Sequence, residues 1–303
     1  MNTTMLLINR NIKIYMRDKA AGFFSMLSML ITLLLMVLFL GSMHSDAIVG
    51  MLAEYGGVRD IRKDQESAKH LVEVWTLAGI ILINCVTVTM TVTGNLVQDE
   101  EEGRLSSFYI APVSRIQVTL GYIISAWLIG TGMSLLTLAA GNLFLVLDGV
   151  GLSLRICLIL TGMILINSFF YASCAYLLSL FVHSQSAWSA LLSIAGTLVG
   201  FLGAVYLPVT MLPKKVGTVL KILPVLHGAS MMRRVSLQDA LTDTFAGLPA
   251  QVLEGCSEGM GITVSVNGEI LSIMAQIVFV VFLSIVMVTA ASLISRKRSM
   301  KER

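Results

Sequence analysis

Gln98 to Arg115 read QDEEEGRLSSFYIAPVSR, a charged stretch that stands between two long apolar runs. Its four consecutive acids, Asp99 to Glu102, would each cost roughly 2.5 to 3.5 kcal/mol at the centre of a bilayer. The stretch must therefore lie in water or against another protein. It ends one membrane span and begins the next, so the runs on either side decide the fold class.

The composition places the chain among integral membrane proteins. Hydrophobic residues make up 56% of it and charged residues 13%, against roughly 25% charged residues in soluble domains. The mean hydropathy is +0.84. The net charge is only +3, and the basic residues do not gather with aromatic residues, so no nucleic-acid partner is expected. Three of the four cysteines fall in apolar runs, and neither a disulfide framework nor a metal-binding spacing follows.

Uncharged runs long enough to cross a membrane recur along the chain, since about 20 apolar residues suffice for one crossing. We predict spans at about residues 22–43, 74–97, 117–147, 156–181, 187–207 and 271–294. The polar HSQS at 183–186 separates the fourth span from the fifth, and residues 46–70 are expected to form a loop. His44 and His183 are interpreted as boundary residues rather than as ligands or bases. We therefore predict a single all-α integral membrane domain with six transmembrane helices over residues 1–303.

The first 19 residues have the pattern of an interfacial helix, which lies in the membrane surface. Apolar residues recur at i, i+3 and i+4, while Arg10, Lys13 and Arg17 occupy another face. The alternative is that this segment is the start of the first span. Six spans place both termini on one side, and nine lysine and arginine residues in the two tails indicate that this side is cytoplasmic. The acids Asp99 to Glu102 oppose this bias, which indicates a protein partner with basic contacts.

Two spans carry helix faces that differ from plain apolar surface. A polar stripe in the second span is expected either to line a translocation path or to form hydrogen bonds within the bundle; it consists of Asn84, Thr87, Thr91 and Asn95. A row of small residues in the fifth span allows another helix to approach, from the same chain or from a second copy; it consists of Ser189, Ser193, Gly196, Gly200 and Gly203. Glycines 130, 132 and 141 in the third span favour kinks or close packing.

The long segment from 208 to 270 begins with a part that is still apolar but is interrupted by prolines. Pro208, Pro213 and Pro224 divide it into pieces that suit short helices dipping into the outer leaflet, with lysines at the water boundary. A small amphipathic cap on the membrane surface is the alternative.

The sequence lacks the motifs of common hydrolases. No Gly-Lys dipeptide occurs, so the P-loop is absent and the polypeptide is not expected to hydrolyse ATP by itself. HExxH and GxSxG are absent too, and no charged residue lies within the six predicted spans. Two classes remain: a transport subunit driven by another protein, and a membrane-embedded non-transporter such as a lipid-modifying enzyme or a signalling subunit.

Two segments resemble the type 2 permease family of ATP-binding-cassette (ABC) exporters. EEGRLSSFYIAPVSR, residues 101–115, is similar to the family's cytoplasmic pattern of an acid, a glycine, a short helix and Pro-x-Ser. YLPVTMLPKKVGTVLKILPVLHGASMMR, residues 206–233, is similar to the segment that follows the family's fifth span. The chain departs from the family pattern at Ala111 and Leu223, where Thr and Asn are common. With six spans in this order, the resemblance covers nearly the whole chain.

The resemblance implies partners and a mechanism. It implies a cytoplasmic ABC ATPase that carries ATP and Mg, no cofactor or metal in this chain, and a second permease chain, identical or paralogous. It also implies a multi-pass location among the lipids of a bacterial plasma membrane. The ATPase would contact a coupling element at 98–116 and would also push the N-terminal helix; the coupling residues are Asp99, Glu100, Glu101, Glu102, Gly103, Arg104, Pro112, Ser114 and Arg115. Pro213 and Pro224, with Arg233 after them, would bound re-entrant helices at the outer end. The expected cargo is a hydrophobic drug or an amphipathic antimicrobial peptide, ahead of a lipid-linked glycan.

Overall fold

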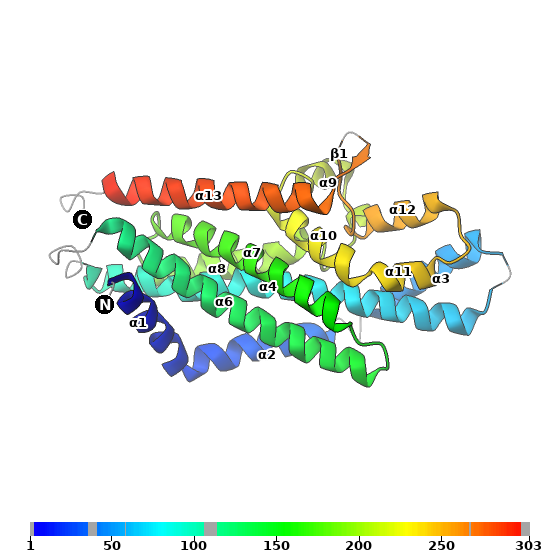
Figure 1. Cartoon of the computed structure of the whole chain (residues 1–303), viewed down its shortest axis with the longest axis horizontal. Helices are drawn as coiled ribbons and strands as arrows, with labels where there is room; N and C mark the ends of the chain where they lie inside the picture. Colours follow the sequence, from blue (N-terminus) through cyan, green and yellow to red (C-terminus); the bar gives the residue numbers. More distant parts are fainter. Residues whose placement is uncertain (1–2, 36–40, 58, 106–113, 267, 298–303) are drawn as a thin grey trace.

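The computed structural model describes residues 3–35, 41–57, 59–105, 114–266 and 268–297. The chain forms an elongated bundle whose long helices run along its long axis, and both termini lie at one end (Figure 1). The helices are α1 (Thr3–Arg17), α2 (Lys19–Leu35), α3 (Gly41–Tyr55), α4 (Ile61–Glu101), α6 (Arg115–Leu147), α7 (Leu154–Ser179), α8 (Gln185–Leu202), η2 (Val209–Met211), α9 (Lys214–Leu220), α10 (Pro224–Ser236), α11 (Gln238–Thr244), α12 (Ala250–Gly259) and α13 (Ile273–Lys297). Strands β1 (Ser265–Val266) and β2 (Glu269–Ile270) form an antiparallel pair in which Ser265 faces Ile270.

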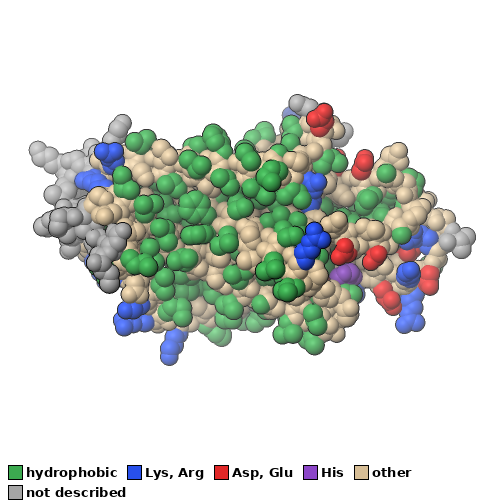
Figure 2. Space-filling view, in the orientation of Figure 1, with side chains coloured by type: hydrophobic (Ala, Val, Ile, Leu, Met, Phe, Trp, Pro, Cys, Tyr) green, Lys and Arg blue, Asp and Glu red, His purple; other side chains and the backbone are tan. Residues whose placement is uncertain are grey.

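Helix α4 is the axis of the bundle. Its 41 residues span about 61 Å at 1.5 Å per residue, roughly twice the hydrocarbon thickness of a bilayer. It packs against α3, α6, α7, α8 and α10, and 78% of its most apolar 18-residue window is buried. In α8 and α13 only 17% of such a window is buried. Figure 2 shows the result, an apolar surface that runs along the bundle between its charged ends.

Helices α4 and α6 approach closely at two glycines of α6. A Cβ on Gly130 would lie 2.4 Å from Thr89 Cγ2, and one on Gly141 would lie 2.1 Å from Leu77 Cδ1. Such distances are too short for real carbon atoms, so a larger residue at either position would require the side chain of Thr89 or Leu77 to move. The predicted close packing is confirmed at these two positions, whereas a Cβ on Gly132 would meet nothing within 4 Å.

Among the described residues, five helices are long and apolar enough to cross a membrane: α4, α6, α7, α8 and α13. They coincide with the second to the sixth predicted spans. The predicted first span, 22–43, coincides with α2 as far as Leu35; residues 36–40 lie outside the described part, and α3 begins at Gly41. The fifth span ends earlier than the predicted residue 207, because α8 stops at Leu202 and Ala204 turns the chain with a φ of +50°.

The prediction of a loop at residues 46–70 is wrong. Most of this segment is helical, since α3 continues to Tyr55 and α4 already begins at Ile61. Asp60 caps α4 by accepting hydrogen bonds from the backbone N–H groups of Arg62 and Lys63. Arg59 forms an ion pair with Asp64 at 2.9 Å and donates to the carbonyls of Thr244 and Ala246, which fastens α11 to the start of α4. The second predicted span, 74–97, thus lies within the longer helix α4.

Candidate functional site

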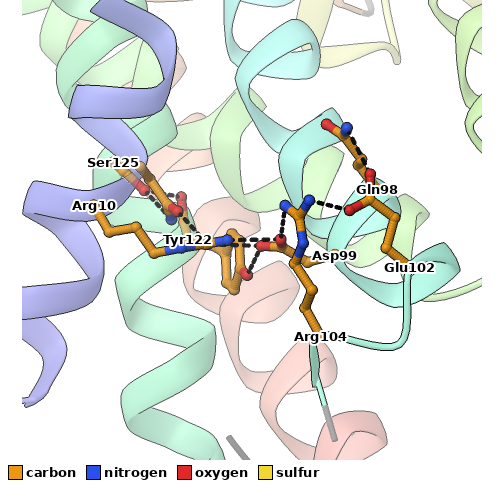
Figure 3. A network of polar contacts seen from close by, with 8 residues as sticks. Arg10, Gln98, Asp99, Glu102, Arg104, Tyr122 and Ser125 are labelled. Atoms are coloured by element: carbon orange, nitrogen blue, oxygen red, sulfur yellow. Dashed lines mark hydrogen bonds and ion pairs between the residues drawn. The ribbon is translucent and has the colours of Figure 1, made fainter. Parts of the chain in front are cut away.

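The acidic run that interrupts the sequence lies where α4 ends, beside α1, the start of α6 and the turn between α7 and α8. Figure 3 shows part of this network from close by. We call Asp99 to Glu102 and the side chains bound to them the acidic junction. It lies at the end of the bundle that holds both termini (Figure 1).

Asp99 is the buried centre of the acidic junction, with a side chain only 2% exposed. Arg10 of α1 donates to its two carboxylate oxygens, each at 2.7 Å, and the hydroxyl of Tyr122 on α6 donates to Oδ2 at 2.5 Å. Arg104 lies 3.4 Å from Oδ1. The hydrogen bond to Asp99 raises the pKa of Arg10. A bidentate, charge-assisted pair is among the strongest side-chain contacts, so one carboxylate fixes three elements relative to one another.

Helix α1 is a separate element that packs onto α6. Leu7, Asn11 and Tyr15 form its buried face. Asn11 Nδ2 donates to Ser125 Oγ at 3.1 Å, and a Cβ on Gly121 would lie 2.9 Å from Leu7 Cβ. Of the three basic residues predicted to share a solvent face, Lys13 and Arg17 are exposed, whereas Arg10 turns inward to the acidic junction. The pattern therefore identified the helix, and its tertiary contact selected which basic residue became part of the site.

The next two acids bind the turn before α8. His183 Nδ1 lies 3.0 Å from Glu100 Oε1, and the backbone N–H of Gln185 donates to Glu101 Oε2 at 2.9 Å. Gln185 is the first residue of α8, so the carboxylate of Glu101 neutralises the positive end of the helix dipole. Because α8 is attached to the end of α4 in this way, the acidic run connects four helices.

The remaining residues of the predicted coupling element are exposed or lie at its edges. Glu102 pairs with Arg104, and Gly103 adopts a φ of +73°, which reverses the chain after α4. Ser114 caps α6 in a capping box with Gln117. Arg115 donates to the carbonyl of Ser295 on α13 at 2.8 Å. Pro112 lies outside the described residues.

The predicted polar stripe on α4 divides between two neighbours. Asn84 is buried and donates to Thr137 Oγ1 of α6 at 2.6 Å. Thr87 and Thr91 are half-buried and donate to backbone carbonyls one turn earlier in α4. A Cβ on Gly196 of α8 would lie 3.6 Å from Thr87 Cγ2, so α8 covers this part of the stripe. Asn95 is half-buried as well.

The row of small residues on α8 also divides. Ser189 and Ser193 are exposed, and the hydroxyl of Ser193 is satisfied by the carbonyl of Ser189 at 3.0 Å. Gly200 and Gly203 are buried in this chain, where a Cβ on Gly200 would lie 2.0 Å from Tyr206. The half of the row with Gly200 and Gly203 therefore packs internally, and the half nearer the acidic junction presents polar groups on the surface.

The prolines of the predicted re-entrant region stand at helix starts. Pro213 precedes α9, and Pro224 is the first residue of α10. Arg233 of α10 is fully buried and donates to the carbonyls of Ala204 at 2.9 Å and of Met260 and Gly261 at 3.3 Å.

Arg233 is also held by the second span. Its guanidinium carbon lies 4.5 Å from the centre of the Trp75 ring, and the indole N–H of Trp75 donates to the carbonyl of Met260 at 2.8 Å. The guanidinium of Arg233 on α10 therefore contacts α4 and the C-terminal ends of α8 and α12.

Sequence reasoning missed Tyr122 and Trp75, the two aromatic residues that complete these clusters. The polar groups of Tyr and Trp need a partner when they are buried, and this rule was the available signal. This rule does not identify the partner, however, because the partner is distant in sequence: Tyr122 is 23 positions from Asp99 and Trp75 is 158 from Arg233.

Comparison with known proteins identifies a family for most of the chain. A family model described as ABC-2 family transporter protein matches residues 57–294. The matched range begins just before α4 and includes the acidic run, the polar stripe and α10, whereas α1 and α2 precede it. A search of curated proteins finds no match.

Proposed function

Because the chain belongs to the ABC-2 transporter family and is thus the membrane subunit of an ABC transporter, we propose that it exports a hydrophobic or amphipathic substrate. A hydrophobic drug or an antimicrobial peptide is proposed ahead of a lipid-linked glycan, because the six predicted spans contain no charged residue. ATP and Mg would be bound by a separate cytoplasmic ATPase. The family match favours this class over a lipid-modifying enzyme or a signalling subunit.

The acidic junction carries the proposal. A force that an ATPase applies to the end of α4 reaches α1 through Arg10, α6 through Tyr122 and α8 through Glu101. Glu102, Arg104 and His183 are the more exposed members and would meet the ATPase first. In this proposal both termini lie in the cytoplasm of a plasma membrane, residues 22–43 form the first of six membrane spans, and α9 and α10 are re-entrant helices at the outer end.

The seam between α4 and α8 is the proposed translocation path. Thr87 and Thr91 lie half-buried beside α8, which is itself the least covered of the long helices together with α13. A small displacement of α8 would uncover these hydroxyls. The exposed face with Ser189 and Ser193 would then meet a second permease chain across the path.

The first test measures ATPase binding to the acidic junction. The chain is co-expressed with an ABC ATPase subunit from the same source, extracted in detergent and captured, and bound ATPase and ATP turnover are measured. We expect Glu102→Lys to lower ATPase recovery at unchanged membrane yield. Glu254→Lys is the matched control, because it reverses an exposed acid on α12 at the opposite end. Equal recovery from both variants would refute the coupling role.

The second test addresses cargo and direction. The assembled complex is reconstituted in vesicles, and ATP-driven movement of a fluorescent hydrophobic drug is compared with that of an amphipathic peptide and a lipid-linked glycan. Accumulation of the drug or the peptide on the side opposite the ATPase supports export. Movement of the glycan alone would replace the proposed cargo class.

A further inference from the structure

A second cluster lies at the end of the molecule opposite the acidic junction. A half-open cavity of about 120 Å³ is bounded by α3, the segment around η2 and α12. Eleven residues line it, and four of them carry sulfur, although the whole chain has only 18 methionines and four cysteines in 303 residues. His44 adds an imidazole to the same wall. The sulfur residues are Met51, Met211, Cys256 and Met260.

We propose that this cavity binds a soft monovalent metal ion, Cu(I), through Cys256 and Met260, with His44, Met51 and Met211 completing the coordination. Thiolate and thioether sulfurs are the ligands that favour Cu(I) over harder cations. Among the described lining residues none is a carboxylate, which disfavours magnesium, calcium and manganese. Nor do three side chains of His, Cys, Asp or Glu gather anywhere in the described part of the chain, so thioethers must supply part of the ligand set.

The spacing of the first two ligands fits one ion. Cys256 and Met260 are one turn apart on α12 and its C-cap, and their sulfur atoms lie 3.7 Å from each other. Two metal–sulfur bonds of about 2.3 Å would span that distance at an angle of about 107°, close to tetrahedral. The contact is a weak thiol–thioether hydrogen bond in the absence of metal, so the two sulfurs already face each other.

The other walls bring their ligands from different elements. His44 and Met51 belong to α3, and Met211 belongs to η2. His44 is 3% exposed and stands against the ring of Trp75 at 5.4 Å between centroids. A neutral imidazole such as that of His44 is the commonest metal ligand in proteins. Small movements of the flexible methionines would close the site.

Coordination exchanges one proton. Binding forms the copper–sulfur bond, breaks the S–H bond and releases the proton to solvent, with no change in oxidation state. The site therefore needs no oxidant or reductant beyond the supply of copper as Cu(I).

Competition for Cu(I) tests the site in the intact chain. The purified protein in detergent, without oxygen, is titrated against the chromophoric chelator bathocuproine disulfonate. We expect one Cu(I) per chain, with the affinity lowered more than about 100-fold in Cys256→Ser, because loss of a direct ligand exceeds the effect of losing a supporting one. Met260→Leu, which keeps the side-chain volume, should also lower it by more than about tenfold, but less than Cys256→Ser, because a neutral thioether binds the cation more weakly than a thiolate does.

Two control variants decide the result. Cys157→Ser removes a thiol from α7, and Met274→Leu changes an exposed methionine of α13. Both should bind Cu(I) like the unmodified chain, and each variant is checked for folding by size-exclusion chromatography. X-ray absorption of the loaded protein should show sulfur at about 2.3 Å. The proposal is overturned if the unmodified chain binds no stoichiometric Cu(I), or if Cys157→Ser loses as much affinity as Cys256→Ser.

Discussion

Asp99→Asn should release α1 from the bundle while leaving the membrane helices assembled. The substitution keeps the shape of the side chain but removes the charge that Arg10 binds through two hydrogen bonds of 2.7 Å. Breaking a fully buried pair costs about 3 to 5 kcal/mol, yet the side chain of Arg10 is 30% exposed and water can partly solvate it. We therefore expect a loss of about 2 to 3 kcal/mol. At about 1.4 kcal/mol per tenfold change, the equilibrium constant for docking of α1 onto the bundle should fall roughly 30- to 150-fold.

Amide hydrogen exchange in lipid nanodiscs measures this release directly. Peptides from α1 should exchange faster in Asp99→Asn, while peptides from α13 keep their protection. Tyr122→Phe removes one hydrogen bond to the same carboxylate and should give a smaller increase. Glu102→Gln is the charge control, because its exposed ion pair with Arg104 contributes less than about 1 kcal/mol.

Two outcomes would refute the reasoning. Unchanged exchange of α1 in Asp99→Asn would mean that packing of the Leu7 face alone holds the helix. Equal acceleration in Glu102→Gln would mean that overall charge, rather than the buried pair, controls docking. If the pair acts as a unit, Arg10→Gln combined with Asp99→Asn should cost less than the sum of the two single changes.

Three further outcomes follow from other contacts. Ser193→Cys, in a chain whose native cysteines are replaced, should form disulfide-linked dimers in membranes, whereas Met274→Cys on exposed α13 should not. Reversed yields of dimer on denaturing gels would contradict the proposed contact of a second chain with the Ser189 and Ser193 face of α8. Arg233→Gln should lower the free energy of unfolding by about 3 kcal/mol in denaturant titration, since buried carbonyls and the Trp75 ring lose their cation; an unchanged midpoint would contradict that. The hydrogen bond from Lys221 lowers the pKa of Glu258 in the folded protein. The stabilisation by this pair is therefore complete above about pH 4.3, the pKa of an unperturbed Glu, and is lost as the pH falls through the lower pKa of Glu258 in the folded state. Amide hydrogen exchange around the pair should rise in acid, and Lys221→Met should remove this dependence on pH.

Most of the membrane-spanning core could be predicted because charge marks its limits. Helices α6, α7 and α13 begin and end within about three residues of the predicted spans, where charged or turn residues make further burial costly. The first part of α4, residues 61–73, was not predicted because hydropathy alone cannot distinguish a polar helix from a loop. Local signals were present in the Asp60 cap and in the ion pairs of Arg62 with Glu66 and of Lys69 with Glu73 at i and i+4.

The site could be located from the sequence but not assembled. The acidic run stood out because it interrupts apolar sequence, yet Arg10 and Asp99 are 89 positions apart. Their contact depends on the direction in which α1 crosses α6, and Gly121 sets that direction by admitting Leu7. No periodicity within α1 distinguishes Arg10 from Lys13 and Arg17. Pairings that arise from packing between distant helices require the tertiary structure.

The acidic junction and the contacts around Arg233 both involve helix α4. Asp99 and Trp75 both belong to α4 and lie 24 residues, or about 36 Å, apart along its axis. The helix has no proline between them, and close packing against α6 at two glycines leaves little room for bending. Under the proposed coupling role, we expect an axial displacement imposed at the acidic junction to reach Trp75, and through its ring Arg233 and the carbonyls at the ends of α8 and α12. The same helix would then connect the proposed ATPase contact at one end of the bundle with the segments held by Arg233 at the other.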